Sequence, residues 1–355
     1  MKKIFRVLAV VAILVLTVCF AFGCTPTTSN NKKGLLLKKF GTDDYYTVYG
    51  YVDEGKDITT LDIDAMAKEI DEDIVVGRIK KNAFNGNTTL KEIIVPTTVE
   101  VMDEGAFAGI RNLEKLTIPF VGGAKNADCY LNETASSEDK AVDLKRTFGY
   151  LFGTSEFAGG AKILQSYNAK STAEVYIPTS LKEVVVKPVG EYKIPMYAFA
   201  GNTVVEKVVL DGNFTAIGEY AFSGATNLRN ITIPATVTTL YKGAFANCAN
   251  LKDQGFAIAS GSQLATIGES AFEGVGLNNL VIPQAVASVG ARAFKNSKLV
   301  SVLLPTSVET IGAYAFYGCT YLANINCEIS AKPNGWNAQW NNNCQATINW
   351  AYTAQ

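Results

Sequence analysis

Cysteine has the greatest capacity for chemistry in this 355-residue chain, because a thiolate can act as a nucleophile, a metal ligand or a disulfide partner. The chain has seven cysteines and no histidine. Without histidine it cannot form a serine–histidine triad, a cysteine–histidine dyad or a histidine-ligated metal site. No two cysteines have the close spacing of a zinc site. The sequence therefore predicts neither an enzyme nor a bound metal or cofactor.

The positions of the cysteines favour structural roles instead. Cys248 and Cys319 occupy one equivalent position of a repeat, which other turns fill with small or aliphatic residues. This predicts buried, unreactive thiols. Cys327 and Cys344 lie 17 residues apart near the end of the chain. They are the candidate disulfide if the protein is exported to an oxidising environment.

Acidic residues give no stronger indication of chemistry. Asp62, Asp64 and the three acids at 71–73 do not have the spacing of a calcium-binding loop. Asp43 and Asp44 are adjacent in a polar segment, and a glycosidase needs two carboxylates on opposite sides of a sugar. We interpret these acids as a solvated surface.

Residues 1–23 have the pattern of a lipoprotein signal peptide. Three basic residues precede an apolar run that ends just before Cys24. In this interpretation Cys24 is lipidated and the polar residues 24–34 form a flexible tether to the membrane. A plain secretory signal and an uncleaved anchor stay open as alternatives. Without residues 1–23, 29 basic residues face 33 acidic ones, and a net charge of about −4 argues against nucleic acid as a partner.

The elements that must position any functional side chain follow from a repeat of 22 or 23 residues. In the turn from Leu228 to Leu251, apolar residues alternate as in a half-buried strand, Pro234 ends that strand, and the pair Ala244–Phe245 follows. One turn cannot bury its own apolar residues, so the repeat indicates a solenoid of stacked turns. The phenylalanine of the Ala-Phe pair recurs at Phe84, Phe107, Phe199, Phe222, Phe245, Phe272, Phe294 and Phe316.

These turns resemble the BspA-type leucine-rich repeat of bacterial surface proteins over roughly residues 75–350. The resemblance implies a mainly β fold, a right-handed leucine-rich-repeat solenoid of 22–23-residue turns with short parallel strands, capped at both ends. It does not identify a ligand, because binding by a repeat fold depends on surface residues. The matching residues of one turn are Leu299, Val302, Leu304, Pro305, Val308, Ile311, Gly312, Ala315, Phe316, Cys319 and Leu322.

Departures from the repeat predict the domain organisation. Residues 35–76 are expected to form an N-terminal cap that contains a short helix between residues 62 and 73. Residues 77–325 form the solenoid. Residues 326–355 hold all three tryptophans, and we interpret them as a C-terminal cap rather than a sugar-stacking site.

Two irregularities interrupt the solenoid. An insertion spans residues 120–172, and its Leu151–Phe152 pair is expected at a corner. The 68 residues from Leu113 to Leu181 approach three periods, which predicts that the stack continues through this region with a surface loop inserted. A 27-residue step between Phe245 and Phe272 predicts a small bulge around residues 253–261.

The outward positions of the strands form the candidate binding face, which we expect to be one broad sheet. In each turn up to Arg229, the two residues before the central outward residue are a charged pair, and its order alternates between Lys-Glu and Glu-Lys from one turn to the next. This order places opposite charges beside each other in the stack. Later turns have little charge, so the C-terminal half is the preferred site and the insertion its competitor. The strand propensity of β-branched residues is the simpler explanation for their recurrence at these outward positions. The candidate residues are Ile94, Thr117, Val185, Val209, Thr232, Val281, Val300 and Leu303.

The resemblance and the signal pattern together imply an exported protein, lipid-anchored at the bacterial cell surface. Its expected function is non-enzymatic binding of an extracellular protein or glycan, as in adhesion, by a monomer. The alternative is a structural or carbohydrate-handling envelope lipoprotein that uses the tryptophan-bearing end. Its expected partners are that ligand and, through the lipid on Cys24, the membrane.

Overall fold

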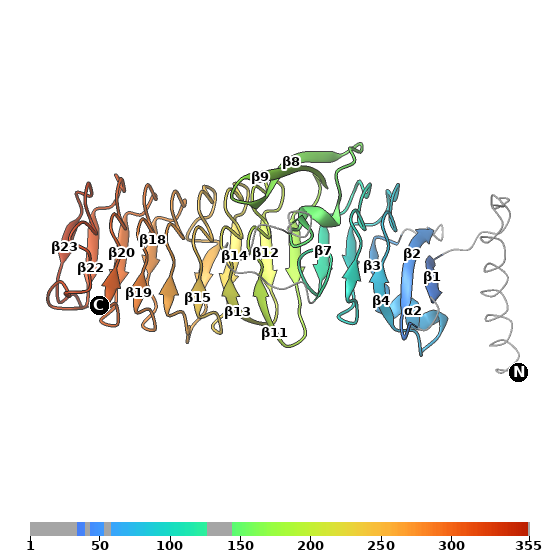
Figure 1. Ribbon diagram of the computed structural model, residues 1–355, viewed down its shortest axis with the longest axis horizontal. Coiled ribbons are helices and arrows are strands. Elements are labelled where there is room, and N and C mark those ends of the chain that lie inside the picture. The colour runs from blue at the N-terminus through green and yellow to red at the C-terminus, as the bar shows by residue number, and fades with distance from the viewer. Residues whose placement is uncertain (1–33, 40–42, 53–57, 126–143, 354–355) are drawn as a thin grey trace, which may run out of the picture. The chain divides into compact units, whose positions relative to one another are not determined.

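The structure, a computed structural model, describes residues 34–39, 43–52, 58–125 and 144–353. Within the compact unit Gly34–Gln355 the chain forms a solenoid of short, mostly parallel strands. Strands of successive turns stack beside one another, in chain order from the blue β1 to the red β23 (Figure 1). The predicted mainly β solenoid with parallel strands is therefore confirmed.

Each turn contributes a strand to one or both sides of the solenoid. On one side a seven-stranded sheet contains β3 (Thr60–Asp62), β5 (Glu92–Ile94), β7 (Lys115–Ile118), β10 (Glu183–Val186), β12 (Lys207–Leu210), β14 (Asn230–Ile233) and β16 (Phe256–Ile258). A four-stranded sheet follows with β18 (Asn279–Val281), β20 (Ser301–Leu304), β22 (Asn324–Cys327) and β23 (Thr347–Asn349).

The other side is also built from two sheets. The first contains β1 (Gly34–Lys39), β2 (Tyr46–Val52), β4 (Val76–Ile79) and β6 (Val101–Met102). The second contains β11 (Glu191–Ile194), β13 (Asn213–Ile217), β15 (Thr239–Leu240), β17 (Thr266–Ile267), β19 (Ser288–Val289) and β21 (Thr310–Ile311). The second strand of each turn is short because only a few residues lie between the proline that ends the first strand and the Ala-Phe corner.

The eight phenylalanines of the repeat form the spine of the core. All are buried, as the sequence predicts. Phe222, Phe245 and Phe272 stack nearly parallel, with ring centroids 5.1 and 5.6 Å apart. Each corner needs left-handed backbone on both sides of the ring, which Gly243 (φ 60°) and Asn247 (φ 61°) supply around Phe245.

The N-terminal end closes the solenoid with a short helix and an antiparallel strand. Helix α2 (Ile63–Ile70) lies within the predicted segment, and the side chain of Asp62 caps it by accepting a hydrogen bond from Ala65 N at 3.0 Å. Its buried residues, Ile63 and Ala67, face the core. Strand β1 pairs antiparallel with β2, which in turn pairs parallel with β4.

The insertion adds no strand to the large sheet, so the expectation that the stack continues through it holds only for one corner. Strand β7 pairs directly with β10, and Thr117 is the register partner of Val185. The intervening chain instead forms an antiparallel hairpin of β8 (Gly160–Asn168) and β9 (Ser171–Pro178), whose backbone groups bond to each other. The side-chain nitrogen of Gln165 fastens this hairpin by donating to Tyr197 O and Ala200 O at 3.0 and 2.8 Å.

Only the corner part of the insertion joins the stack. Phe148 and Phe152 are fully buried between Phe107 and Phe199, with ring centroids 4.9 to 6.1 Å apart. The short 3-10 helix Gly149–Leu151 connects them. The prediction that Leu151–Phe152 takes a corner position is therefore confirmed. The insertion adds one corner to the solenoid and no strand to its large sheet.

Candidate binding face

The strand face is the outward side of the two sheets β3–β16 and β18–β23. None of the eight predicted residues is buried, and seven are the middle outward residues of their strands. Val300 lies beside this row, just before β20, and is 42% exposed. Whether the row binds anything stays a prediction. The register pairs that align it are Ile94–Thr117, Thr117–Val185, Val185–Val209, Thr232–Ala257 and Val281–Leu303.

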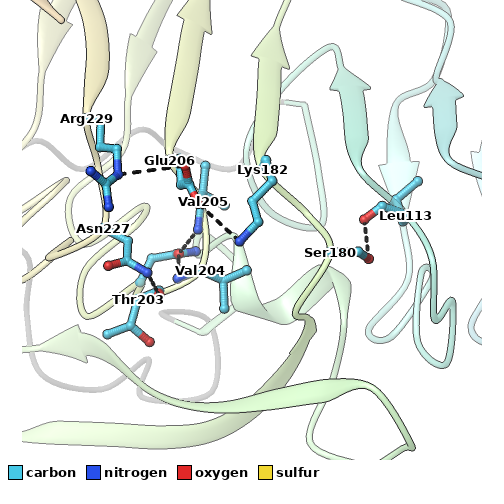
Figure 2. A network of polar contacts seen from close by, with 10 residues as sticks. Leu113, Ser180, Lys182, Thr203, Val204, Val205, Glu206, Asn227 and Arg229 are labelled. Carbon is cyan, nitrogen blue, oxygen red and sulfur yellow. Dashed lines mark hydrogen bonds and ion pairs between the residues drawn. The ribbon is translucent and has the colours of Figure 1, made fainter.

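Opposite charges stack along the N-terminal half of the strand face, as the alternating order predicts. Lys91 lies 2.9 Å from Glu114, and Lys115 lies 2.8 Å from Glu92. Further along, Glu206 contacts Lys182 at 3.1 Å and Arg229 at 3.7 Å (Figure 2). Exposed pairs of this kind contribute well under about 1 kcal/mol each, so their main effect is to keep like charges apart.

Beyond Lys252 and Asp253, which follow Arg229 by one turn, the outward positions of the strand face carry less charge and are more apolar. Val281 is 66% exposed, the highest value among the large hydrophobic residues of the described chain. Its register partner Leu303 lies beside it on β20. The two positions that carry Lys and Glu in earlier turns are Lys252 and Asp253 in the long turn, and then Asn278 and Asn279, Val300 and Ser301, and Ala323 and Asn324.

The strand face is also divided in two, which the sequence analysis missed. Strand β16 ends the seven-stranded sheet and β18 begins the next, with no pairing between them among the described residues. The cause is the long turn. Phe256, five residues after Leu251, pairs with Ile231, which lies three residues after Leu228, so β16 starts late. The predicted bulge is confirmed, and the expectation of one broad sheet is wrong.

At the break, the side chain of Asp253 accepts the hydrogen bonds that a backbone carbonyl accepts in other turns. In other turns, two successive backbone N–H groups donate to one carbonyl of the turn before, as Glu206 and Lys207 do to Lys182 O at 2.9 Å each. At the break no such carbonyl is in place. Instead, the N–H groups of Asn278 and Asn279 donate to the Asp253 carboxylate at 2.7 and 3.1 Å, and the Asn279 side chain donates at 2.9 Å.

These hydrogen bonds change the acidity of Asp253. Burial by itself raises the pKa of Asp253, but the hydrogen bonds from Asn278 and Asn279 outweigh it and hold the pKa below the ordinary 3.8. A carboxyl whose folded pKa is lowered stabilises the fold above its unfolded pKa. That stability is lost as the pH falls through the folded pKa.

Asp253→Asn is accordingly expected to lower the free energy of unfolding by about 1 kcal/mol at neutral pH. The amide keeps one acceptor oxygen but turns an NH₂ group toward backbone donors. Urea unfolding should show this difference between wild type and variant shrinking below about pH 4. A difference that is constant down to about pH 2.5 would mean that the charge on Asp253 contributes nothing.

The break opens a cleft of about 500 Å³ on the strand face. The strand edges of β16 and β18 line it, together with the outward residues Val281 and Leu303 and the loop that follows β16. Its lining is uncharged apart from Asp253, whose carboxylate is already hydrogen-bonded. The predicted bulge and the predicted apolar part of the strand face therefore both line this cleft.

Two of the three tryptophans lie inside the C-terminal end of the solenoid, and Trp350 is half-buried. Trp336 and Trp340 are 2% and 3% exposed, and Trp340 packs edge-on against Phe316 at 5.8 Å. The indole N–H of Trp336 donates to Val308 O at 3.1 Å. Neither ring presents a face to solvent, so these residues cover the last turn and do not support a sugar-stacking site.

The cysteines of the described chain are free thiols without a catalytic environment. Cys248 and Cys319 are buried, as predicted, and burial raises the pKa of Cys248 to about 12. Cys327 and Cys344 are also free, so the predicted disulfide is not formed in the structure. Cys327 is fully buried on β22, and burial raises its pKa to about 12. Such thiols are poor nucleophiles.

Other predicted features have separate outcomes. Among the described residues, no group of three or more His, Cys, Asp or Glu side chains is arranged to hold a metal ion. Within the same residues, no helix has the length and apolar character needed to cross a membrane. Cys24, the predicted lipidation site, and the predicted signal peptide lie outside the described part of the chain.

Comparison with solved structures finds other leucine-rich repeat proteins. One from Bacteroides ovatus is 20% identical, covers 83% of this chain and 70% of its own, and has a TM-score of 0.41. A leucine-rich cell surface protein from Faecalibacterium prausnitzii is 16% identical over 91% of this chain and 99% of its own, with a TM-score of 0.33. Among proteins of curated function, none matches the chain.

Comparison with protein families gives a specific result. Residues 65–132, 192–257 and 254–348 match the BspA type leucine rich repeat region, in six copies. These ranges span more than half of the chain and contain the stacked phenylalanine corners on both sides of the insertion. The chain therefore belongs to the BspA-type leucine-rich repeat family.

Proposed function

We propose that this protein is a non-enzymatic binding protein of the bacterial cell surface, which recognises an extracellular protein or glycan, as in adhesion. The observation that carries the proposal is the change along the strand face at Arg229. Up to Arg229 the charges are paired with each other; in the later turns the outward residues Val281, which is exposed, and Leu303 line a cleft. An uncharged apolar patch on an otherwise polar repeat surface is the kind of surface that partners bury.

A binding screen against arrays of extracellular proteins and glycans tests the proposal. The double substitution Val281→Lys and Leu303→Lys is expected to weaken binding to a partner found there at least about tenfold, because two charges would have to be desolvated. The fold should survive, since neither side chain is buried.

Two controls make this result specific. Val185→Lys and Val209→Lys place the same charges in the same row of the N-terminal half, and should bind like wild type. Deletion of residues 126–140 removes part of the competing insertion and should also leave affinity intact. If the deletion abolishes binding while the double-lysine variant binds normally, the site lies in the insertion.

We further propose that Cys24 carries a lipid that holds the protein at the membrane. The charged start and apolar run before Cys24 support this, as does the polar segment after it. Cys24→Ala is expected to abolish incorporation of a radiolabelled fatty acid and to leave the chain uncleaved or released into the medium. A wild-type protein that stays with the membrane without any acyl label would contradict the lipid anchor.

A further inference from the structure

The break in the strand face leaves two strand edges facing one cleft. In a parallel sheet, successive residues turn their N–H and C=O groups alternately to the neighbouring strands on either side. The strand pairings therefore determine which backbone groups of β16 and β18 point into the sheet and which point into the cleft.

On β16, the groups that face the cleft belong to Phe256 and Ile258. Gly255 O accepts from Ile231 N at 2.8 Å and Ala259 N donates to Ile233 O at 2.9 Å, so these alternate residues face β14. Phe256 N donates back to Lys252 O within the turn. Within the described chain, Phe256 C=O and both backbone groups of Ile258 have no strand to pair with on the cleft side.

On β18, the corresponding groups belong to Asn279 and Val281. Asn278 O accepts from Val300 N at 2.6 Å and Ile282 N donates to Leu303 O at 3.0 Å, so these residues face β20. The N–H of Asn279 is held by Asp253. Asn279 C=O and the N–H and C=O of Val281 point toward β16, where no described strand pairs with them.

The cleft thus has unpaired backbone donors and acceptors along both walls and apolar side chains at its rim. Exposed strand edges are usually blocked by charge, proline or a covering segment, because they pair with other chains. Here the outward side chains that line the cleft include Val281 and Leu303, and the carboxylate of Asp253 is already hydrogen-bonded. The only aromatic ring that lines the cleft, Phe256, is 9% exposed and offers no stacking surface for a sugar.

We propose that this cleft binds an extended, uncharged segment of another polypeptide as an added β-strand. The backbone of such a segment would bond to the Val281 edge, the Ile258 edge or both, and its alternate side chains would lie against Val281 and Leu303. This inference rests on the proposed binding function and specifies its partner as an extended peptide rather than a glycan.

A synthetic peptide of alternating valine and threonine, labelled with a fluorophore, tests the inference by fluorescence anisotropy with the full chain. The matched probe has the same sequence with alternate backbone nitrogens methylated, which removes the donors on one side and keeps every side chain. Methylation is expected to weaken binding at least about tenfold, since two or more backbone hydrogen bonds are lost.

Protein variants locate the site. Val281→Pro removes the N–H that points into the cleft and should weaken peptide binding at least about tenfold, whereas Val281→Ala keeps the N–H and should have a smaller effect. Thermal unfolding should show that both variants fold, because this N–H bonds to no strand in the native state. Equal binding by the two variants, equal binding of the two peptides, or no binding of either peptide overturns the inference.

The outcome separates this inference from the proposed function. Suppose that the double-lysine variant no longer binds the partner found in the screen, but Val281→Pro binds it as tightly as Val281→Ala. The strand face then recognises side chains, and the inference of an added strand is wrong. If that partner binds the double-lysine variant normally, the proposed face itself is wrong.

Discussion

Replacing Phe245 by alanine is expected to lower the free energy of unfolding by about 3–5 kcal/mol. The ring is fully buried and stacks on Phe222 and Phe272, with centroids 5.1 and 5.6 Å away, and Phe256 meets it edge-on at 6.2 Å. Its neighbours belong to other turns whose backbones are hydrogen-bonded together, so they cannot collapse into the space left by the ring. The cavity therefore stays open and its full cost is expressed.

Urea unfolding followed by circular dichroism measures this loss as a shift of the midpoint. The control is Tyr321→Ala, which removes an aromatic ring that is 65% exposed and should change stability by less than about 0.5 kcal/mol. An unfolding midpoint of Phe245→Ala equal to that of the wild type would mean that the phenylalanine spine does not hold the turns together.

Replacing Trp336 by alanine is the second large expected effect, again about 3–5 kcal/mol. Trp336 is among the largest fully enclosed side chains of the described chain, and it packs on Trp340 at 4.8 Å and Trp350 at 5.9 Å. It lies between the last regular turns and the cap, where it bridges to Ile311. Its loss would leave a cavity in the C-terminal end of the described core.

Trp336→Phe separates packing from hydrogen bonding. Phenylalanine fills much of the space but leaves Val308 O without the indole donor that lies 3.1 Å away. This variant should lose less stability than the alanine variant, by an amount that thermal unfolding can resolve. If Trp336→Ala unfolds like the wild type and loses affinity for a glycan, the tryptophan is a binding residue and its assignment to the cap is wrong.

The regular turns could be predicted from the sequence because their determinants are local and repeated. Alternating apolar residues, a proline after the strand and an Ala-Phe pair recur at a fixed spacing, and each turn can bury them only against its neighbours. The outward row from Ile94 to Leu303 and the stacked charges followed from the same alternation. These predictions needed the period of the chain and no knowledge of long-range contacts.

The candidate site could be predicted only in part. The loss of charge after Arg229 and the long step before Phe272 are both visible in the sequence. Their meeting at one cleft is not, because it depends on where β16 pairs with β14 and on the carboxylate of Asp253 replacing a backbone carbonyl. The repeat pattern of the sequence reveals neither the role of the Asp253 carboxylate as an acceptor nor the unpaired backbone groups of Ile258 and Val281.

Local patterns in the sequence are enough to predict the solenoid, its buried corners and the direction in which each strand residue points. How the irregular segments pair their backbone groups becomes visible only in the folded chain. A long insertion can pair with itself, as β8 and β9 do, or extend the stack, and its length does not distinguish the two. The physical reason is that periodic burial is fixed locally, whereas each unpaired N–H and C=O finds its partner only when distant turns meet.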